Sequence, residues 1–182
     1  MSRVPGPMAG PRIRSLMLQD LERILEIDER VTKVPRRGAD NDLWRLLAET
    51  TTCFGAESDG KLVGFVLADV RPWEFGNRAH VGWIIMLGVD PAHQKKGVGR
   101  LLGERVLEEF KRQGVAEFKT LVDEGDDGLR KYFEALGFRS AREVVLRMGD
   151  GARRGKAKPR RKRAPAVRSR TKPRTTRGPR SR

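Results

Sequence analysis

A strand that leads into a glycine-opened helix lies in the middle of the chain. An apolar run at 81–89 breaks at an Asp-Pro pair, and after two lysines a helical pattern begins with Gly97-x-Gly99. The first turn of a helix offers unpaired backbone N–H groups and roughly half a positive charge, which suits an anion, most often a phosphate. Glycine usually follows the end of a helix rather than opening it. We therefore expect a strand, a phosphate-binding turn and a helix within an α/β fold.

Hydrophobic periodicity predicts a single domain built on a mixed sheet. Ser58-Asp59-Gly60 is a turn of the kind that closes hairpins, so strands are expected on both sides of it. The predicted order is a strand at 13–16, helices at 21–31 and 43–49, strands at 50–57, 61–70 and 79–89, a helix at 99–112, a strand at 117–122, a helix at 129–136 and a closing strand at 138–148. This order indicates the α/β class, with an α+β mixed sheet and helices on its faces.

Burial can be predicted for a few positions. Trp44 and Leu47 are expected to pack on the core from the second helix. The strand at 79–89 is apolar enough to be buried on both faces. Cys53 is expected in a core strand, because an unpaired cysteine behaves as a small hydrophobic residue.

Composition excludes several classes of protein. One cysteine allows neither an intrachain disulfide nor a cysteine-based zinc cluster, and two histidines make a histidine metal site unexpected. The apolar run at 81–89 is far shorter than the ~20 residues of a membrane helix. The first residues lack the apolar region of a signal peptide. We therefore expect a soluble cytoplasmic protein without a metal or a membrane anchor.

Charge divides the chain into a neutral body and a basic end. Of the net charge of +15, residues 151–182 supply 15 Lys or Arg and no acid, which leaves 24 basic and 24 acidic residues elsewhere. We predict a flexible N-terminal arm at 1–11, a folded domain at 12–148 and a disordered Lys/Arg-rich tail at 149–182, because the tail has little to bury. The tail is expected to contact nucleic acid or ribosomes without sequence specificity. A solubilising appendage is the alternative.

The glycine spacing also fits a dinucleotide-binding fingerprint. Gly97-x-Gly99-x-x-x-Gly103 matches it, and Asp123 stands where a ribose-binding acid is expected. However, seven residues separate Val89 from the first glycine, whereas a dinucleotide fold turns directly from strand to glycine. A second βαβ half is also missing from the predicted order, so the dinucleotide interpretation is disfavoured.

Three motifs in order resemble those of the GNAT superfamily of N-acetyltransferases. QKKGVG at 94–99 is similar to the Q/R-x-x-G-x-G/A signature that binds the pyrophosphate of acetyl-CoA. LGVDP before it and YFEALGF at 132–138 are similar to two further motifs of that family at matching distances. The resemblance covers about residues 12–148 and implies a single GNAT-like acyl-CoA N-acyltransferase domain.

The resemblance implies acetyl-CoA as the acyl donor, an amine as the acceptor and no metal. Main-chain groups of Leu87, Gly88 and Val89 would pair with the pantetheine arm, as a peptide adds to an open sheet edge, with the Val89 N–H near the thioester carbonyl. A Cβ at Gly97 or Gly99 would stand between backbone and phosphate. The implied cofactor-binding residues are Leu87, Gly88, Val89, Lys95, Lys96, Gly97, Val98, Gly99 and Arg100.

The catalytic acid is not assigned, because the sequence departs from the family pattern. Phe133 stands where members often have a tyrosine that acts as general acid. Tyr132 lies about 100° around the helix from it and is not expected to reach the same sulfur. Leu121 stands in place of a carboxylate, and Asp126, in place of a frequent asparagine, is explained as a helix cap.

Candidate bases are carboxylates and one histidine near the expected opening of the sheet. Glu74 and His80 are expected beside the opening, and Asp123 and Glu124 on an acidic turn that would attract a cationic amine. Each is explained more simply as a solvated charge or a cap, so none is assigned. Neutralising a lysine at pH 7 costs about 4.6 kcal/mol and an α-amine about 1, so a base matters more for lysine acceptors.

The sequence therefore predicts an acetyl-CoA-dependent N-acetyltransferase. The acetyl group would pass to a primary amine of a protein or a small molecule, while residues 151–182 tether the enzyme to nucleic acid or ribosomes. The alternative is a catalytically inactive protein of the same fold that acts as a nucleic-acid- or ribosome-associated binding module, since Phe133 lacks the hydroxyl of an acid.

Overall fold

The computed structural model describes residues 10–35, 38, 40–50, 52–72 and 80–146. Contacts divide the chain at Ser140, and the first unit, to that residue, contains all of the regular elements described. Its elements are β1 (Arg12–Ser15), η1 (Leu18–Asp20), α1 (Leu21–Thr32), α2 (Asp40–Glu49), β2 (Phe54–Ser58), β3 (Lys61–Pro72), β4 (His80–Val89), η2 (Pro91–His93), α3 (Val98–Arg112), β5 (Glu117–Thr120) and α4 (Asp127–Ala135).

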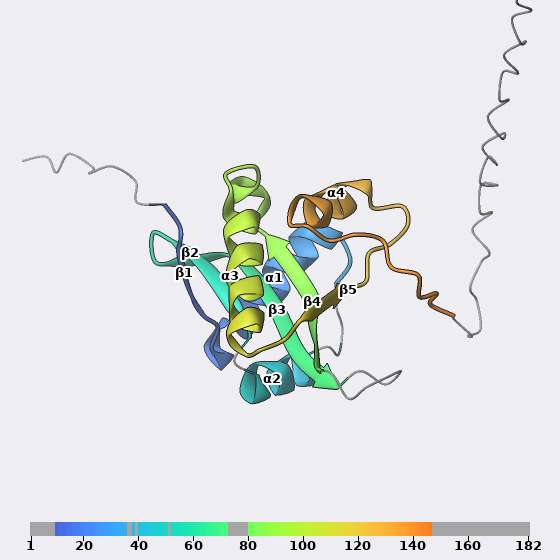
Figure 1. Ribbon diagram of the computed structural model, residues 1–182. Helices are drawn as coiled ribbons and strands as arrows, with labels where there is room; N and C mark the ends of the chain where they lie inside the picture. The colour runs from blue at the N-terminus through green and yellow to red at the C-terminus, as the bar shows by residue number, and fades with distance from the viewer. Residues whose placement is uncertain (1–9, 36–37, 39, 51, 73–79, 147–182) are drawn as a thin grey trace, which may run out of the picture. The chain divides into compact units, whose positions relative to one another are not determined.

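The five strands form one mixed sheet in the order β1-β2-β3-β4-β5. The first four pair antiparallel with their neighbours, and β5 pairs parallel with β4. Because parallel neighbours need a crossover, α3 links β4 to β5 across one face of the sheet (Figure 1). The predicted hairpin between β2 and β3 is confirmed, with Asp59 and Gly60 at φ +50° and +72° in the turn.

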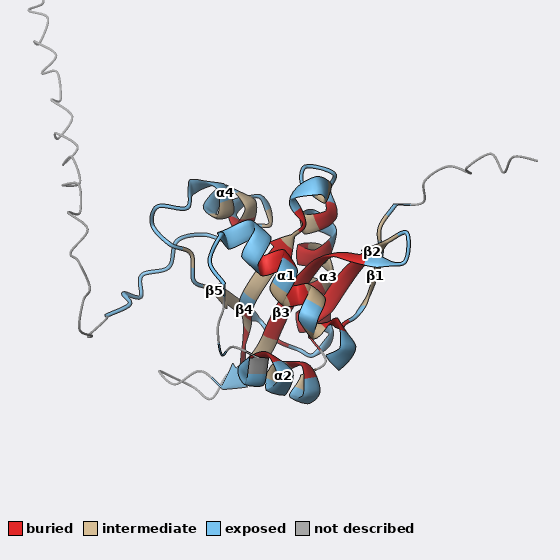
Figure 2. Ribbon diagram, turned by 180° about the vertical axis from the view of Figure 1, so that it is seen from behind, coloured by how far each residue is buried: buried red, intermediate tan, exposed pale blue. Residues whose placement is uncertain are grey.

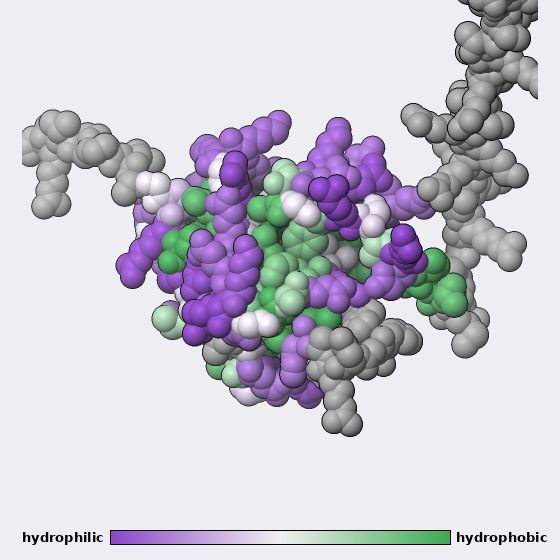
Figure 3. Space-filling model, viewed as in Figure 1, coloured by the Kyte–Doolittle hydropathy of each residue, from purple (hydrophilic) through white to green (hydrophobic). Residues whose placement is uncertain are grey.

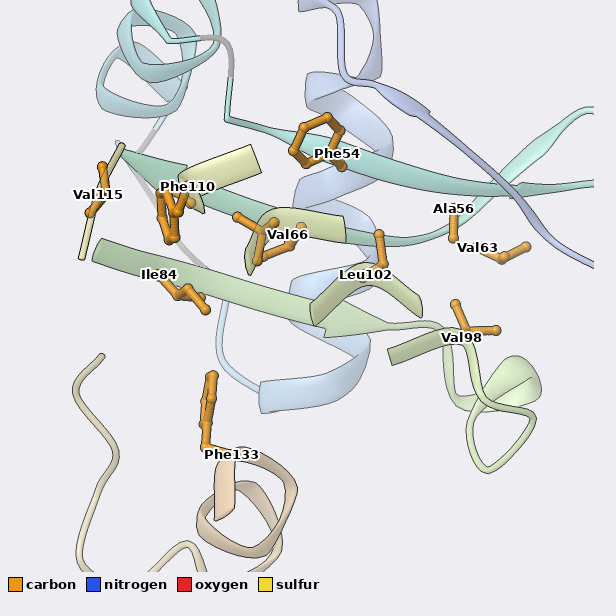
Figure 4. Packing of buried hydrophobic residues seen from close by; sticks show 12 residues of the cluster. Phe54, Ala56, Val63, Val66, Ile84, Val98, Leu102, Phe110, Val115 and Phe133 are labelled. Atoms are coloured by element: carbon orange, nitrogen blue, oxygen red, sulfur yellow. The ribbon is translucent and has the colours of Figure 1, made fainter. Parts of the chain in front are cut away.

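Two hydrophobic clusters lie on opposite faces of the sheet. On one face α3 packs through Leu102, Val106 and Phe110, and α4 adds Phe133, which points toward β4 (Figure 4). On the other face α1 and α2 cover the sheet (Figure 2), with Ile24 and Ile27 of α1 fully buried. The predicted α/β class with helices on both faces of a mixed sheet is confirmed.

Two predictions of burial are wrong and two are confirmed. Trp44 is 52% exposed, whereas Leu47 is buried as expected. Leu43 and Leu47 are spaced by four and define the buried face of α2, so Trp44 points away from it. Ile85 of β4 is 41% exposed, so that strand is not buried on both faces along its whole length. Cys53 is buried, one residue before β2 begins.

The predicted closing strand at 138–148 is not found where the structure can test it. Residues 138–146 contain no strand, and 147–148 lie outside the described residues. The three apolar residues Val144, Val145 and Leu146 are consecutive and exposed, so they lack the alternation that a half-buried strand requires. Among the described helices, none has the length and apolarity needed to cross a membrane. Residues 1–9 of the predicted arm at 1–11, and the whole of the predicted tail at 149–182, likewise fall outside the described residues.

Candidate functional site

The sheet opens between β4 and β5. The two strands pair only from Val81 to Ile84 of β4, and β4 continues alone to Val89 along this edge of the described sheet. Opposite β3, the register shifts so that Ile85 is an extra residue in β4. A bulge of this kind bends a strand and increases its twist. The Thr120 hydroxyl donates to the Ile84 carbonyl at 3.1 Å, at the point where the strands part.

The opening exposes main-chain groups of alternate residues. The Asp90 N–H donates to the Val63 carbonyl of β3 at 2.9 Å, and successive residues of a strand face opposite ways. Gly88 therefore directs its main-chain groups toward β3, while Leu87 and Val89 direct theirs to the open edge. Gly88 has a packing role, since a Cβ there would lie 2.7 Å from the Phe65 ring. Of the three strand residues predicted from sequence, two thus present main-chain groups at the opening.

A small apolar cavity lies where the strands separate. Its volume is about 50 Å³. It is lined by Ile84, Ile85, Met86 and Leu87 of β4, Thr120 at the end of β5 and Leu121 after it, and Leu129 and Phe133 of α4. Hydrophobic residues also reach the surface between the hydrophilic outer faces of α3 and α4 (Figure 3). None of these lining side chains ionises near neutral pH. The cavity suits an apolar arm or acyl group.

A tight turn joins β4 to α3 beside this opening. Lys95 and Gly97 have positive φ of +59° and +82°, and Gly97 is the N-cap residue of α3. The first bond of the helix runs from the Leu101 N–H to the Gly97 carbonyl at 3.1 Å. The N–H groups of Val98, Gly99 and Arg100 precede it and have no acceptor within the helix. This is an anion-binding geometry with two lysines beside it.

Within the protein, the two glycines of the turn differ in what a side chain would meet, and the predicted clash of a Cβ with the phosphate stays a prediction. A Cβ on Gly97 would meet no atom within 4 Å, but the φ of +82° is one that other residues rarely adopt. A Cβ on Gly99 would lie 3.4 Å from the Tyr132 ring and 3.7 Å from Val89. Within the protein, therefore, backbone conformation requires the first glycine, and the second faces α4.

A buried carboxylate anchors the start of the turn. Asp90 is 2% exposed, and its Oδ2 accepts from Arg23 and Arg30 of α1 at 2.7 Å each. Its Oδ1 accepts from the Ala92 N–H at 3.0 Å. Burial alone would raise the pKa of Asp90, but the Ala92 N–H and the two guanidinium groups hold it below its ordinary value. Sequence reasoning missed this anchor because its partners lie 60 and 67 residues away.

The predicted bases do not converge on the cavity. His80 is at the opposite end of β4, five residues and about 17 Å of strand before Ile85, so its predicted place beside the opening is wrong. Glu74 lies outside the described residues. Asp123 and Glu124 are exposed, and Asp123 accepts the Gly125 N–H at 2.8 Å as a local cap. Among the described residues, none of the candidates is held against the cavity as a base.

The helix α4 separates its two aromatic side chains as expected. Phe133 is 4% exposed and lines the cavity. Tyr132 turns toward α3, where its hydroxyl donates to the Gly99 carbonyl at 2.7 Å. Asp126 caps the helix by accepting the Leu129 N–H at 2.9 Å, which confirms the predicted cap. The described residues contain no group of three or more His, Cys, Asp or Glu arranged to hold a metal ion.

The open strand edge, the apolar cavity and the turn with free N–H groups together fit an extended cofactor with an apolar arm and a diphosphate. This is the arrangement expected of an acyl-CoA-dependent acyltransferase. The acetyltransferase (GNAT) family matches residues 18–138, and the chain belongs to this family. The match confirms the predicted family.

Curated relatives and solved structures carry related names. The [ribosomal protein bS18]-alanine N-acetyltransferase of Escherichia coli strain K12 is 28% identical over 132 residues, which cover 71% of this chain and 81% of that protein. The mycothiol acetyltransferase of Thermomonospora curvata is 34% identical over 85 residues, 47% of this chain. The chain matches only 27% of the length of that relative.

Solved structures show the same fold. An aminoglycoside N-acetyltransferase, AAC(6')-Iy, in complex with CoA superposes with a TM-score of 0.68 at 20% identity, covering 81% of this chain and 99% of that one. A ribosomal-protein-alanine N-acetyltransferase from Brucella melitensis biovar Abortus 2308 gives a TM-score of 0.62 at 21% identity, over 76% and 99% of the two chains. At these identities the likeness shows a shared fold.

Proposed function

We propose that this protein transfers the acetyl group of acetyl-CoA to a primary amine of a protein or a small molecule. The observation that carries the proposal is the continuity between the open edge of β4 and the turn at 94–99. Leu87 and Val89 offer main-chain groups to a pantetheine arm, and the first turn of α3 offers N–H groups to a diphosphate. Lys95, Lys96 and Arg100 are exposed around that turn and add positive charge.

Not all of the main-chain groups of Leu87 and Val89 are free to bind a ligand. The Val89 carbonyl already accepts the Gln94 side-chain amide at 3.0 Å, which fixes the turn to the end of β4. The Val89 N–H and both main-chain groups of Leu87 are then the groups available to a ligand on this edge. An N–H at this point can polarise the thioester carbonyl and stabilise the oxyanion that forms when the amine attacks.

The chemistry needs no covalent intermediate with the protein. The neutral amine nitrogen forms a bond to the thioester carbon and loses a proton, the C–S bond breaks, and the thiolate takes up a proton. Phe133 cannot donate that proton, and the cavity lining holds no ionisable side chain. Water therefore carries it, and positioning with oxyanion stabilisation supplies the rate.

The acceptor is an amine whose neutral form is accessible. Exposed carboxylates at Asp123, Glu124 and Asp127 follow β5 and supply negative charge for a cationic acceptor. The relatives are named a ribosomal-protein-alanine N-acetyltransferase and a mycothiol acetyltransferase, so both a protein α-amine and a small-molecule amine belong in the test panel. The cytoplasmic location, and tethering to nucleic acid or ribosomes by residues 151–182, are further parts of the proposal that rest on sequence alone.

A second candidate is a binding protein of the same fold without catalysis, which Phe133 favours because it lacks a hydroxyl. The test is acetyl-CoA turnover by the full chain with α-amine peptides, lysine peptides, polyamines and amino sugars. Turnover with any acceptor supports the enzyme, whereas CoA binding without turnover supports the binding protein. Thermal shift by NAD(P) and not by CoA would refute both.

The role of the tail has its own experiment. Removing residues 151–182 is expected to leave acetyl-CoA affinity unchanged and to weaken salt-dependent binding to duplex DNA and ribosomes. Equal binding by the full and shortened chains would show that the tail is only a solubilising appendage.

A further inference from the structure

Gly103, in the second turn of α3, lies outside the turn that is proposed to bind the diphosphate, so its occurrence needs another reason. Gly103 follows Gly99 by four residues on α3, so the two share one face of the helix. A Cβ on Gly103 would lie 2.5 Å from the Tyr132 hydroxyl and 2.5 Å from Cδ1 of Leu136. A side chain at this position would therefore displace the side chains of Tyr132 and Leu136.

Tyr132 makes the polar contact of this interface. Its hydroxyl donates to the Gly99 carbonyl at 2.7 Å, and its ring faces the Cβ position of Gly99 at 3.4 Å. Burial, and after it the negative charge of Glu104, raises the pKa of the Tyr132 hydroxyl. The hydroxyl consequently keeps its proton at physiological pH and remains a donor.

The two helices carry different halves of the proposed coenzyme site. The first turn of α3 offers its N–H groups to the diphosphate, whereas Leu129 and Phe133 of α4 line the cavity for the apolar arm. Tyr132 precedes Phe133 directly, and its hydroxyl reaches the carbonyl of Gly99 within the diphosphate turn. This one hydrogen bond therefore fixes the distance between the two halves.

We infer that Tyr132 is a positioning residue that couples the diphosphate turn to the acyl cavity, with Gly99 and Gly103 as its socket. The inference rests on the proposed function, because both halves are sites for coenzyme A. A ligand that spans the two halves benefits from their fixed spacing. A ligand that occupies only the turn does not.

The experiment compares two ligands by isothermal titration with the full chain. Coenzyme A spans both halves, and adenosine 3′-phosphate 5′-diphosphate contains the diphosphate without the pantetheine arm. Tyr132→Phe keeps the ring and removes only the hydroxyl. We expect its Kd for coenzyme A to rise about fivefold, the usual value of one hydrogen bond, and its Kd for the fragment to stay within about twofold.

Two glycine variants complete the experiment, one that disturbs the contact between α3 and α4 and one that serves as a control. Gly103→Ala is expected to weaken coenzyme A binding more than Tyr132→Phe does, again with less effect on the fragment. Gly128→Ala, in α4, is the matched control, since its Cβ would meet only Asp126 at an ordinary 3.5 Å, and it should change neither Kd. Circular dichroism and Tm report folding, and Tyr132→Phe carries the test if Gly103→Ala does not fold.

Three results would overturn the inference. Equal loss of affinity for both ligands would place the effect in the diphosphate turn alone. No change for coenzyme A would show that the hydrogen bond is only structural. Failure of the wild-type chain to bind either ligand would refute the proposed function as well, which distinguishes the two failures.

Discussion

Replacing Asp90 by Asn tests whether the buried carboxylate holds the coenzyme turn. The substitution keeps the shape and an oxygen for the Ala92 N–H, and it removes the charge that faces Arg23 and Arg30 at 2.7 Å each. Hydrogen bonds to charged groups contribute about 1.5–3 kcal/mol each when buried. Both guanidinium groups are partly exposed, at 30% and 45%, so water recovers part of the loss. We expect about 2 kcal/mol of destabilisation.

The assay is thermal and urea unfolding of the full chain, with coenzyme A affinity measured in parallel. A loss of about 2 kcal/mol corresponds to a fall in Tm of about 4–8 °C for a domain of this size. Coenzyme A affinity should fall as well, because the turn loses its anchor to α1. Asp59→Asn is the matched control, since Asp59 is exposed and its φ of +50° is one that asparagine also adopts.

The double variant Asp90→Asn with Arg23→Met measures the interaction between these two side chains apart from their other contacts. If the carboxylate and guanidinium act together, the double variant should be more stable than the sum of the two single losses predicts. Additive losses, or a Tm change below about 1 °C for Asp90→Asn alone, would refute the assignment of Asp90 as an anchor.

Three further outcomes are expected. Gly97→Ala should lose about 1 kcal/mol in urea unfolding and should bind coenzyme A more weakly, because its φ is +82°. Leu47→Ala should cost about 2–5 kcal/mol, whereas Trp44→Ala, at a 52% exposed position, should cost under about 1 in the same assay. Hydrogen bonds from Arg112 first, then Gln113, lower the pKa of Glu109 to about 2, so its stabilisation is present above its ordinary pKa of 4.5 and is lost as the pH falls toward 2. The Tm advantage of wild type over Glu109→Gln should therefore shrink across that range, and a constant advantage would contradict this.

Local signals in the sequence predicted the local structure well. The turn at Asp59-Gly60 closes the β2–β3 hairpin, and Asp126 caps α4. The glycines before α3 marked the turn, because an unusual residue at a helix start needs a local reason. The predicted cofactor residues lie together from the end of β4 to the first turn of α3, and their contacts with coenzyme A remain a prediction.

The features that sequence could not provide depend on distant partners. The extra residue Ile85 is visible only against β3, and the role of Asp90 only against α1. Trp44 was assigned to the wrong face because both faces of a short amphipathic helix carry apolar residues. His80 was placed near the opening because strand β4 was predicted without knowing at which end it separates from β5.

Because Ile85 is an extra residue, the residues of β4 that face α3 change from even-numbered to odd-numbered along the strand. Before it, Gly82 and Ile84 face α3; after it, Leu87 and Val89 do, and Gly88 instead faces Phe65 and Ile27. Deleting Ile85 would place Ile84 and Met86 next to each other opposite Ala68 and Leu67, so every later position of β4 would keep its present side. Leu87 and Val89 would still face α3 and Gly88 would still face Phe65, but β4 would lose the bend that the extra residue gives it where β5 separates from it. The extra residue is thus explained by the shape of the strand at the opening, and the packing of the later side chains does not depend on it.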